Sequence, residues 1–147
     1  MKVSKRQCKA ELSFEENQIP KAVKYCGYFD KNPSWRFSKG DDKHGKWSPY
    51  LVMRNDTEAF ISKLKNFESR LWSDIISDRD RNHFIEIYKL AKCAQKRCDE
   101  ICLVCDELFS LRLSGRERLF GVIEDGVFYI IWYDKDHEIC PSLKKHT

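Results

Sequence analysis

Two apolar segments joined by Asp125-Gly126 constrain the fold of this chain more than any other feature of its sequence. Asp-Gly tolerates the two positive φ angles of a type I′ turn, which connects antiparallel strands through two residues. The register that such a turn imposes gives the pairs Ile123 with Phe128, Val122 with Tyr129, Phe120 with Ile131, and Arg118 with Tyr133. The region from 108 to 134 is therefore predicted to form three consecutive antiparallel strands that carry arginines.

Side chains alternate between the two faces of a strand, so the same register divides the hairpin into two faces. One face is predicted to carry Arg118, Phe120, Val122, Tyr129, Ile131 and Tyr133, and the other Leu119, Ile123, Phe128, Ile130 and Trp132. A guanidinium and a phenol are thus expected side by side at one end of the sheet.

Apolar residues before this region recur at helical spacing. Asn55 and Glu58 have the spacing of a capping box, and the pattern that follows predicts an amphipathic helix from about 56 to 77. A second helix, capped by Asp80 or Asn82, is predicted to run to about Cys98. The short connection between the two helices favours an antiparallel pair, which needs an apolar surface to pack on.

The predicted fold class is α+β, with two antiparallel helices packed on a twisted antiparallel sheet of three to four strands. A chain of 147 residues has the size of one domain. Residues 1–50 contain prolines and glycines without a sustained period, and they are interpreted as an N-terminal extension. Short strands are expected there at Trp35 to Ser38 and at Trp47 to Met53. Residues 51–147 form the predicted αβ domain.

The net charge of +4 is concentrated in the N-terminal third, where residues 1–48 hold 11 Lys and Arg against 6 Asp and Glu. Basic and aromatic side chains alternate there, a mixture suited to phosphate neutralisation and base stacking. Lys46 and Trp47 are the candidate RNA-binding residues of this segment. The same composition also suits a solvated lead-in whose aromatic side chains cover the domain.

Membrane insertion is not expected, because the longest apolar run, Val127 to Tyr133, is far shorter than the ~20 residues a spanning helix needs. The first residues lack the apolar stretch of a signal peptide, so a cytoplasmic protein is predicted. Seven cysteines, an odd number, are then interpreted as reduced thiols.

Three closely spaced cysteines allow a metal site as an alternative. Cys98, Cys102 and Cys105 have the spacing that holds a four-iron cluster in radical SAM enzymes, but too few residues follow for the barrel of such an enzyme. With Cys140 they could instead supply four thiolates to zinc. The simpler interpretation, which we prefer, is an apolar junction between helix and sheet with no metal and no cofactor.

The C-terminal segments together resemble the RelE/ParE toxin superfamily, and their local amino-acid sequence is similar to that of the RelE branch. The resemblance covers roughly residues 56–141: two helices, a strand ending Leu111-Arg-Leu-Ser-Gly115, an arginine-led strand Arg118-Leu-Phe-Gly-Val-Ile123, an acidic turn and an apolar strand. It implies a sheet whose uncovered concave face binds RNA. RelE-like members cut messenger RNA in the ribosome without a metal, and ParE-like members poison gyrase.

The resemblance also implies roles for individual residues. Arg118 falls on the arginine that opens the family's central strand and stabilises phosphate charge. His137 and Lys135 fall near the family's basic or imidazole position after the last strand. The implied partners are RNA or the ribosome and a cognate antitoxin protein.

The residues themselves suit metal-independent RNA cleavage, which needs a base for the 2′-hydroxyl, a cation for the phosphate and an acid for the leaving oxygen. The candidate catalytic residues are Arg118, His137, Tyr133 and Arg116, and the candidate RNA-binding residues are Arg112, Lys135, Lys46 and Trp47. A non-catalytic module that binds RNA or a protein such as gyrase is the alternative. His83, at the expected start of the second helix, is not expected to take part.

Overall fold

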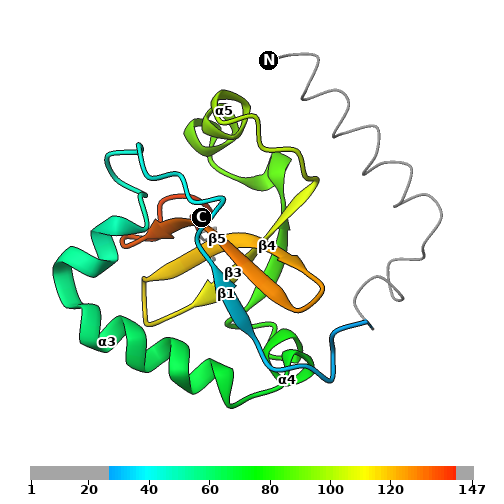
Figure 1. The fold of residues 1–147 in the computed structure, drawn as a ribbon. Helices are drawn as coiled ribbons and strands as arrows, with labels where there is room; N and C mark the ends of the chain where they lie inside the picture. Colours follow the sequence, from blue (N-terminus) through cyan, green and yellow to red (C-terminus); the bar gives the residue numbers. More distant parts are fainter. Residues whose placement is uncertain (1–26, 142–147) are drawn as a thin grey trace, which may run out of the picture.

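A computed structural model of the protein describes residues 27–141, so most of the predicted N-terminal extension falls outside the described part. Five strands form one mixed sheet in the order β1-β5-β4-β3-β2. The strands are β1 (Ser34–Arg36), β2 (His83–Glu86), β3 (Glu107–Arg112), β4 (Arg118–Glu124) and β5 (Val127–Asp134). β1 is parallel to β5 and the other neighbours are antiparallel, so the α+β class holds with more strands than predicted (Figure 1).

The hairpin turn forms as predicted, but the register changes beyond it. Asp125 and Gly126 have φ angles of 49° and 82°, and Val122 pairs with Tyr129. A β-bulge between Phe120 and Gly121 then shifts the pairing by one residue. Gly121 still pairs with Ile130 in the predicted register, and the new pairs are Phe120 with Trp132, Leu119 with Tyr133, and Arg118 with Asp134. The predicted pair of Arg118 with Tyr133 is therefore wrong, and Trp132 and Tyr133 exchange faces.

Gly121 explains why the bulge lies at this point. A Cβ atom at this position would lie 2.0 Å from the carbonyl oxygen of Tyr129, a distance that no side chain tolerates. Only glycine lets the two backbones approach so closely, which is a recurrent use of glycine within strands.

The first predicted helix is two helices, α3 (Tyr50–Glu68) and α4 (Trp72–Ser77). α3 begins at Tyr50, so the strand expected from Trp47 to Met53 is wrong. Asp56 has a non-helical backbone, and its Oδ1 accepts a hydrogen bond from the N–H of Ala59 at 3.0 Å. The cap predicted near residue 55 thus exists one residue later, at a kink inside the helix.

The second predicted helix is wrong in its first half. Residues 83–86 form β2, followed by the 3₁₀ turn η1 (Ile87–Lys89) and helix α5 (Lys92–Glu100). The segment around β2 is rich in aromatic and β-branched residues, which favour strands over helices. β2 pairs with β3 and places His83 opposite Ser110.

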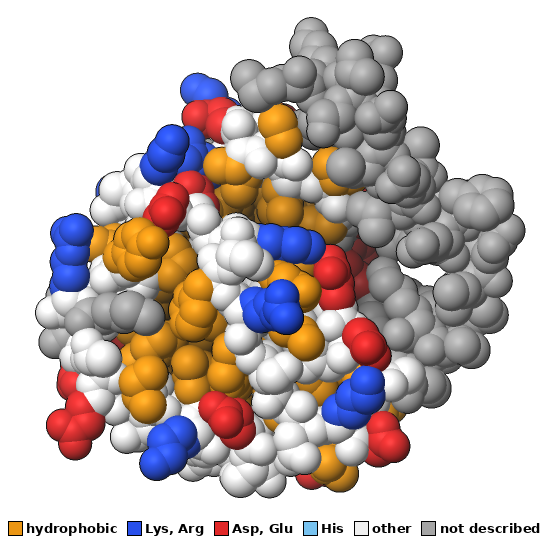
Figure 2. Space-filling view, in the orientation of Figure 1, with side chains coloured by type: hydrophobic (Ala, Val, Ile, Leu, Met, Phe, Trp, Pro, Cys, Tyr) orange, Lys and Arg blue, Asp and Glu red, His pale blue; other side chains and the backbone are white. Residues whose placement is uncertain are grey.

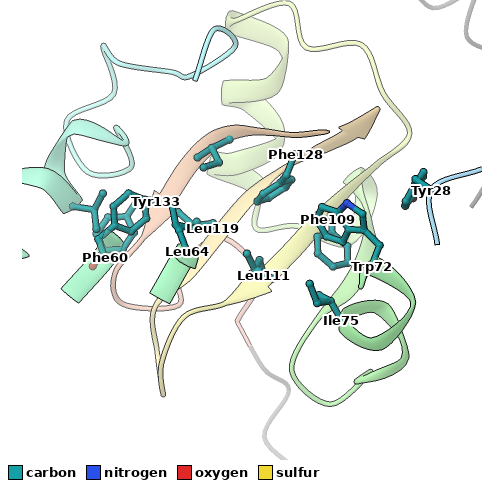
Figure 3. Close-up of a cluster of buried hydrophobic side chains, with 12 residues drawn as sticks. Tyr28, Phe60, Leu64, Trp72, Ile75, Phe109, Leu111, Leu119, Phe128 and Tyr133 are labelled. Carbon is teal, nitrogen blue, oxygen red and sulfur yellow. The ribbon is translucent and has the colours of Figure 1, made fainter. Parts of the chain in front are cut away.

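Helices cover both faces of the sheet. α3 and α4 contribute Phe60, Leu64, Trp72 and Ile75 to one core cluster, which includes Tyr133 and Leu119 (Figure 3). On the other face, Ala94 and Cys98 of α5 pack in a cluster with Leu108, Phe120, Ile131 and Trp132. The prediction that both helices share one face and leave the other open is therefore wrong.

The described part of the N-terminal extension belongs to the same sheet. β1 adds a parallel edge strand, close to the strand predicted at Trp35 to Ser38. The N–H of Tyr133 donates to the carbonyl of Trp47 at 2.8 Å, which fixes the segment before α3 against the end of β5. None of the helices within residues 27–141 has the length and apolar character needed to cross a membrane.

Candidate functional site

Basic side chains converge at one end of the sheet, on the face covered by α5. Arg112 pairs with Arg118 across β3 and β4, and Arg118 pairs with Asp134 of β5. His83 begins β2 opposite Ser110. Alternation along each strand places these side chains on the same face as Leu108, Phe120 and Trp132. We name the set His83, Arg112, Arg118 and His137 the cationic cluster.

Backbone carbonyls of the turn between β3 and β4 hold both guanidinium groups. One amino group of Arg118 donates to the carbonyl oxygens of Ser114 at 3.0 Å, Gly115 at 3.0 Å and Glu117 at 3.1 Å. The Nε of Arg112 donates to Ser114 at 3.2 Å. Within residues 27–141, Arg118 forms no salt bridge, so its charge is oriented by dipoles rather than neutralised by a carboxylate.

Asp134 shapes the loop that carries His137. Its two carboxylate oxygens accept hydrogen bonds from the N–H groups of Glu138 at 3.0 Å and Ile139 at 2.8 Å. His137 has a positive φ of 61°, a conformation that a non-glycine residue adopts only where its surroundings hold it. The buried carboxylate of Asp134 thus fixes the turn that brings His137 back to the end of the sheet.

The pKa values show that the four groups influence one another. Partial desolvation and then Arg118 lower the pKa of His83. Desolvation and then Arg118 also lower the pKa of His137, although Asp134 acts in the opposite direction. Burial and Arg112 lower the pKa of Arg118 itself. Two imidazoles therefore lie within electrostatic reach of one largely buried guanidinium, as expected for a site built for an anion.

The structure brings together some of the predicted catalytic residues and separates others. Arg118 pairs with Arg112 across β3 and β4, and after desolvation its charge lowers the pKa of His137. Tyr133 lies on the opposite face because of the bulge, and its hydroxyl donates to Glu117. Burial and this hydrogen bond raise the pKa of Tyr133. Arg116 is exposed in the turn between β3 and β4.

Glu117 fastens that turn to α3. Its carboxylate accepts hydrogen bonds from Lys63 at 3.1 Å and from the hydroxyl of Ser114 at 2.5 Å, besides the one from Tyr133. Burial opposes ionisation of Glu117, but these hydrogen bonds outweigh burial and lower its pKa. The turn that orients Arg112 and Arg118 is therefore itself held in place.

Other predicted RNA-binding residues line a hollow of about 330 Å³ beside the cluster. Lys46, Trp47, Tyr133 and Lys135 contribute to its lining. Asp134 borders the hollow and also faces Arg118, so the two features are neighbours.

His83 is the member of the cluster that the sequence interpretation missed. A helix starting at residue 82 would not have aligned it with β3, whereas strand β2 places it, still exposed, on the face that carries Arg118. The aromatic and β-branched residues from 84 to 88 were the available signal for a strand.

The basic and aromatic residues of the described N-terminal segment mostly serve the fold. Tyr28 and Trp47 are buried, while Lys31 pairs with Asp125 at 2.8 Å and Lys39 pairs with Glu124 at 2.7 Å. Figure 2 shows lysine and arginine side chains interspersed with aspartate and glutamate rather than gathered on this face of the molecule. The described segment agrees with an interpretation as a cover for the domain.

The alternative metal site does not form in the described residues. Within 27–141, no group of three or more His, Cys, Asp or Glu side chains is arranged to hold a metal ion. Cys98 of α5 is buried in the core, and burial raises the pKa of Cys105 to about 12. Cys98, Cys105 and Cys140 pack as small apolar residues in one core cluster.

Comparison of the chain with protein-family models, with curated proteins and with solved structures finds no match. The resemblance to the RelE/ParE superfamily therefore remains a prediction.

Proposed function

We propose that this protein is a toxin-like, metal-independent endoribonuclease whose active site is the cationic cluster. The observation that carries the proposal is that strand pairing places His83, Arg112 and Arg118 at one end of one sheet face. The turn held by Asp134 brings His137 back to that end, and partial desolvation and then Arg118 lower the pKa of both histidines. Two imidazoles beside one guanidinium supply the base, the acid and the cation that phosphodiester cleavage by a 2′-hydroxyl requires.

In the proposed reaction, the neutral imidazole of His83 takes the proton of the 2′-hydroxyl as its oxygen attacks the adjacent phosphorus. Arg118 and Arg112 stabilise the negative charge that builds up on the phosphoryl oxygens. The imidazolium of His137 gives its proton to the departing 5′-oxygen. The bond to the 5′-oxygen breaks, and the products are a 2′,3′-cyclic phosphate and a 5′-hydroxyl.

The two histidines receive different roles because their neighbours differ. Asp134 favours the charged form of His137, which suits an acid, and it does not act on His83. Both imidazoles have lowered pKa values in the free protein, and the negative charge of a bound phosphodiester would raise them again by favouring the charged form. The site is thus charged for acid catalysis when substrate is present.

The experiment is cleavage of a defined RNA in the presence of a chelator, with His83→Ala and His137→Ala as test variants and Arg36→Ala, on the exposed edge strand, as the control. We expect each histidine variant to lose at least ~100-fold in rate, in line with the size of general acid–base effects. A second RNA with one 2′-deoxy residue at the cut position should resist cleavage there.

Two results would decide against the proposal. Cleavage of the 2′-deoxy position would rule out attack by the 2′-hydroxyl. Retention of RNA binding by a wild-type protein that yields no fragments would favour the alternative of a non-catalytic module that uses the same cluster. Inhibition of growth on expression, relieved by a small protein encoded in a neighbouring reading frame, would support the toxin assignment and its antitoxin partner.

A further inference from the structure

A second concave feature lies next to the cationic cluster. The hollow of about 330 Å³ is lined by Trp47, Leu51 and Tyr133 on its apolar side. Its polar side consists of Lys46, Lys135, Asp136 and Glu138. This volume is at the low end of the range for small-ligand pockets, so it suits one nucleobase better than a longer segment of RNA.

The loop after β5 joins the hollow to the cluster. Asp136 and Glu138 line the hollow, and His137 lies between them in the chain. Backbone hydrogen bonds from Glu138 and Ile139 to the carboxylate of Asp134 hold this loop in place. Asp134 pairs with Arg118 across β5 and β4 and also lines the hollow, so a nucleotide with its phosphate at Arg118 would place its base next to the hollow.

The side chains of the hollow favour one kind of base. Carboxylates accept hydrogen bonds, and guanine is the base that presents two adjacent N–H donors on its Watson–Crick edge, with an acceptor oxygen beside them. Lysine donates to such an oxygen. The Nζ of Lys46 lies 3.8 Å from the Oε2 of Glu138, so a cation and a carboxylate lie side by side in the hollow.

We propose that this hollow is a guanine-binding subsite that sets the cleavage preference of the enzyme, with Asp136 and Glu138 as the acceptors and Lys46 as the donor. The inference rests on the proposed ribonuclease function. It assigns the predicted RNA-binding residues Lys46 and Trp47 to recognition of a base rather than to neutralisation of the backbone.

The test maps cleavage sites on an RNA that contains all four bases in equal numbers. Wild-type protein should cut next to guanine at least about tenfold faster than next to adenine, because two hydrogen bonds are lost with adenine. Asp136→Asn and Glu138→Gln should abolish the preference, so that the rates of cleavage next to guanine and next to adenine become equal. Asp74→Asn, on the exposed surface of α4, is the control that should keep the preference.

The outcomes separate this inference from the function on which it rests. Cleavage without preference for guanine, or a preference that survives both variants, would overturn the subsite while the ribonuclease stands. If no RNA is cut, the ribonuclease fails, and binding of guanosine 3′-monophosphate against adenosine 3′-monophosphate decides the subsite alone. Tighter binding of the guanine nucleotide, lost in Asp136→Asn, supports it, and equal binding of the two nucleotides overturns it.

Discussion

Two arginines on the same face of the sheet have opposite surroundings. Arg97 of α5 donates to both oxygens of Asp41, at 2.7 Å and 2.8 Å, and the indole of Trp132 completes the site at 2.9 Å. Arg118 has only carbonyl partners within the described residues, and other basic groups adjoin it. The hydrogen bond to Asp41 raises the pKa of Arg97, whereas burial and Arg112 lower that of Arg118.

This difference separates an arginine whose ion pair is complete within the fold from one that has no carboxylate partner in the described residues. Burial opposes ionisation of Asp41, but hydrogen bonds from Arg97 and Trp132 outweigh it and lower its pKa, so the ion pair is complete within the fold. The cationic cluster has several positive or protonatable groups and one nearby carboxylate, Asp134, whose oxygens are engaged by backbone N–H groups. An anion bound from outside the protein would balance the positive charge of the cationic cluster.

The largest expected effect is on stability. Arg97→Ala should lower the free energy of unfolding by about 3 kcal/mol, because it leaves the buried carboxylate of Asp41 without its cation. Urea denaturation of the variant measures this loss. The double variant Arg97→Leu with Asp41→Leu should recover much of it, since no charge is then stranded. A change below about 1 kcal/mol in Arg97→Ala would contradict the structural role.

The second prediction concerns a variant that should lose activity but, unlike Arg97→Ala, little stability. Arg118→Gln should reduce RNA cleavage at least ~100-fold, the scale for loss of one group that stabilises transition-state charge. Its unfolding free energy should change less than that of Arg97→Ala, because removing one of several crowded cations relieves repulsion. The matched control is Arg36→Gln in the exposed strand β1. A larger loss of unfolding free energy in Arg118→Gln than in Arg97→Ala would contradict the distinction drawn between the two arginines.

The third prediction concerns anions. Sulfate present at ten times its dissociation constant should stabilise the wild-type protein by about 1.4 kcal/mol. Sodium chloride of the same ionic strength should not reproduce the effect. Arg118→Gln should lose the stabilisation and Arg36→Gln should keep it, as followed by the thermal midpoint. Equal stabilisation of all three proteins would indicate a general salt effect.

The sequence predicted the parts of this fold that depend on local signals. The Asp125-Gly126 turn and the three C-terminal strands follow from turn chemistry and side-chain alternation. The bulge at Gly121 does not follow from alternation, because it arises where two backbones come too close for a side chain. Its consequence is that Tyr133 faces α3 and leaves the candidate site.

The arrangement of the helices could not be predicted for a different reason. Spacing alone does not distinguish a helix from a strand followed by a short turn and a helix, and the segment 82–98 fits both. Pairing of β2 with β3 decides between them, and this is a contact between distant segments. His83 entered the candidate site through that pairing, so its role was not visible in the sequence.

The smallest expected effect is the dependence of stability on pH. Partial desolvation and Arg118 lower the pKa of His83 and His137 below the ordinary value of 6.5, so the unfolded chain binds more protons than the folded protein just below pH 6.5. The stability contributed by the neutral imidazoles is therefore complete above pH 6.5 and is lost as the pH falls through the lowered values. Solvent screening keeps this loss small, because His83 is exposed.

Histidine variants and bound sulfate test whether the pH dependence of stability arises from the cationic cluster. The double variant His83→Gln with His137→Gln should flatten the slope of unfolding free energy between pH 7 and pH 5, as measured by urea denaturation at each pH. Asp41 and Glu117 have lowered pKa values and lose their contribution only at more acidic pH, so they do not mask the effect. Sulfate should reduce the slope in the wild-type protein, because a bound anion favours imidazolium. A slope that neither the variant nor sulfate alters would mean that the titrating groups lie elsewhere and that the cluster does not hold an anion.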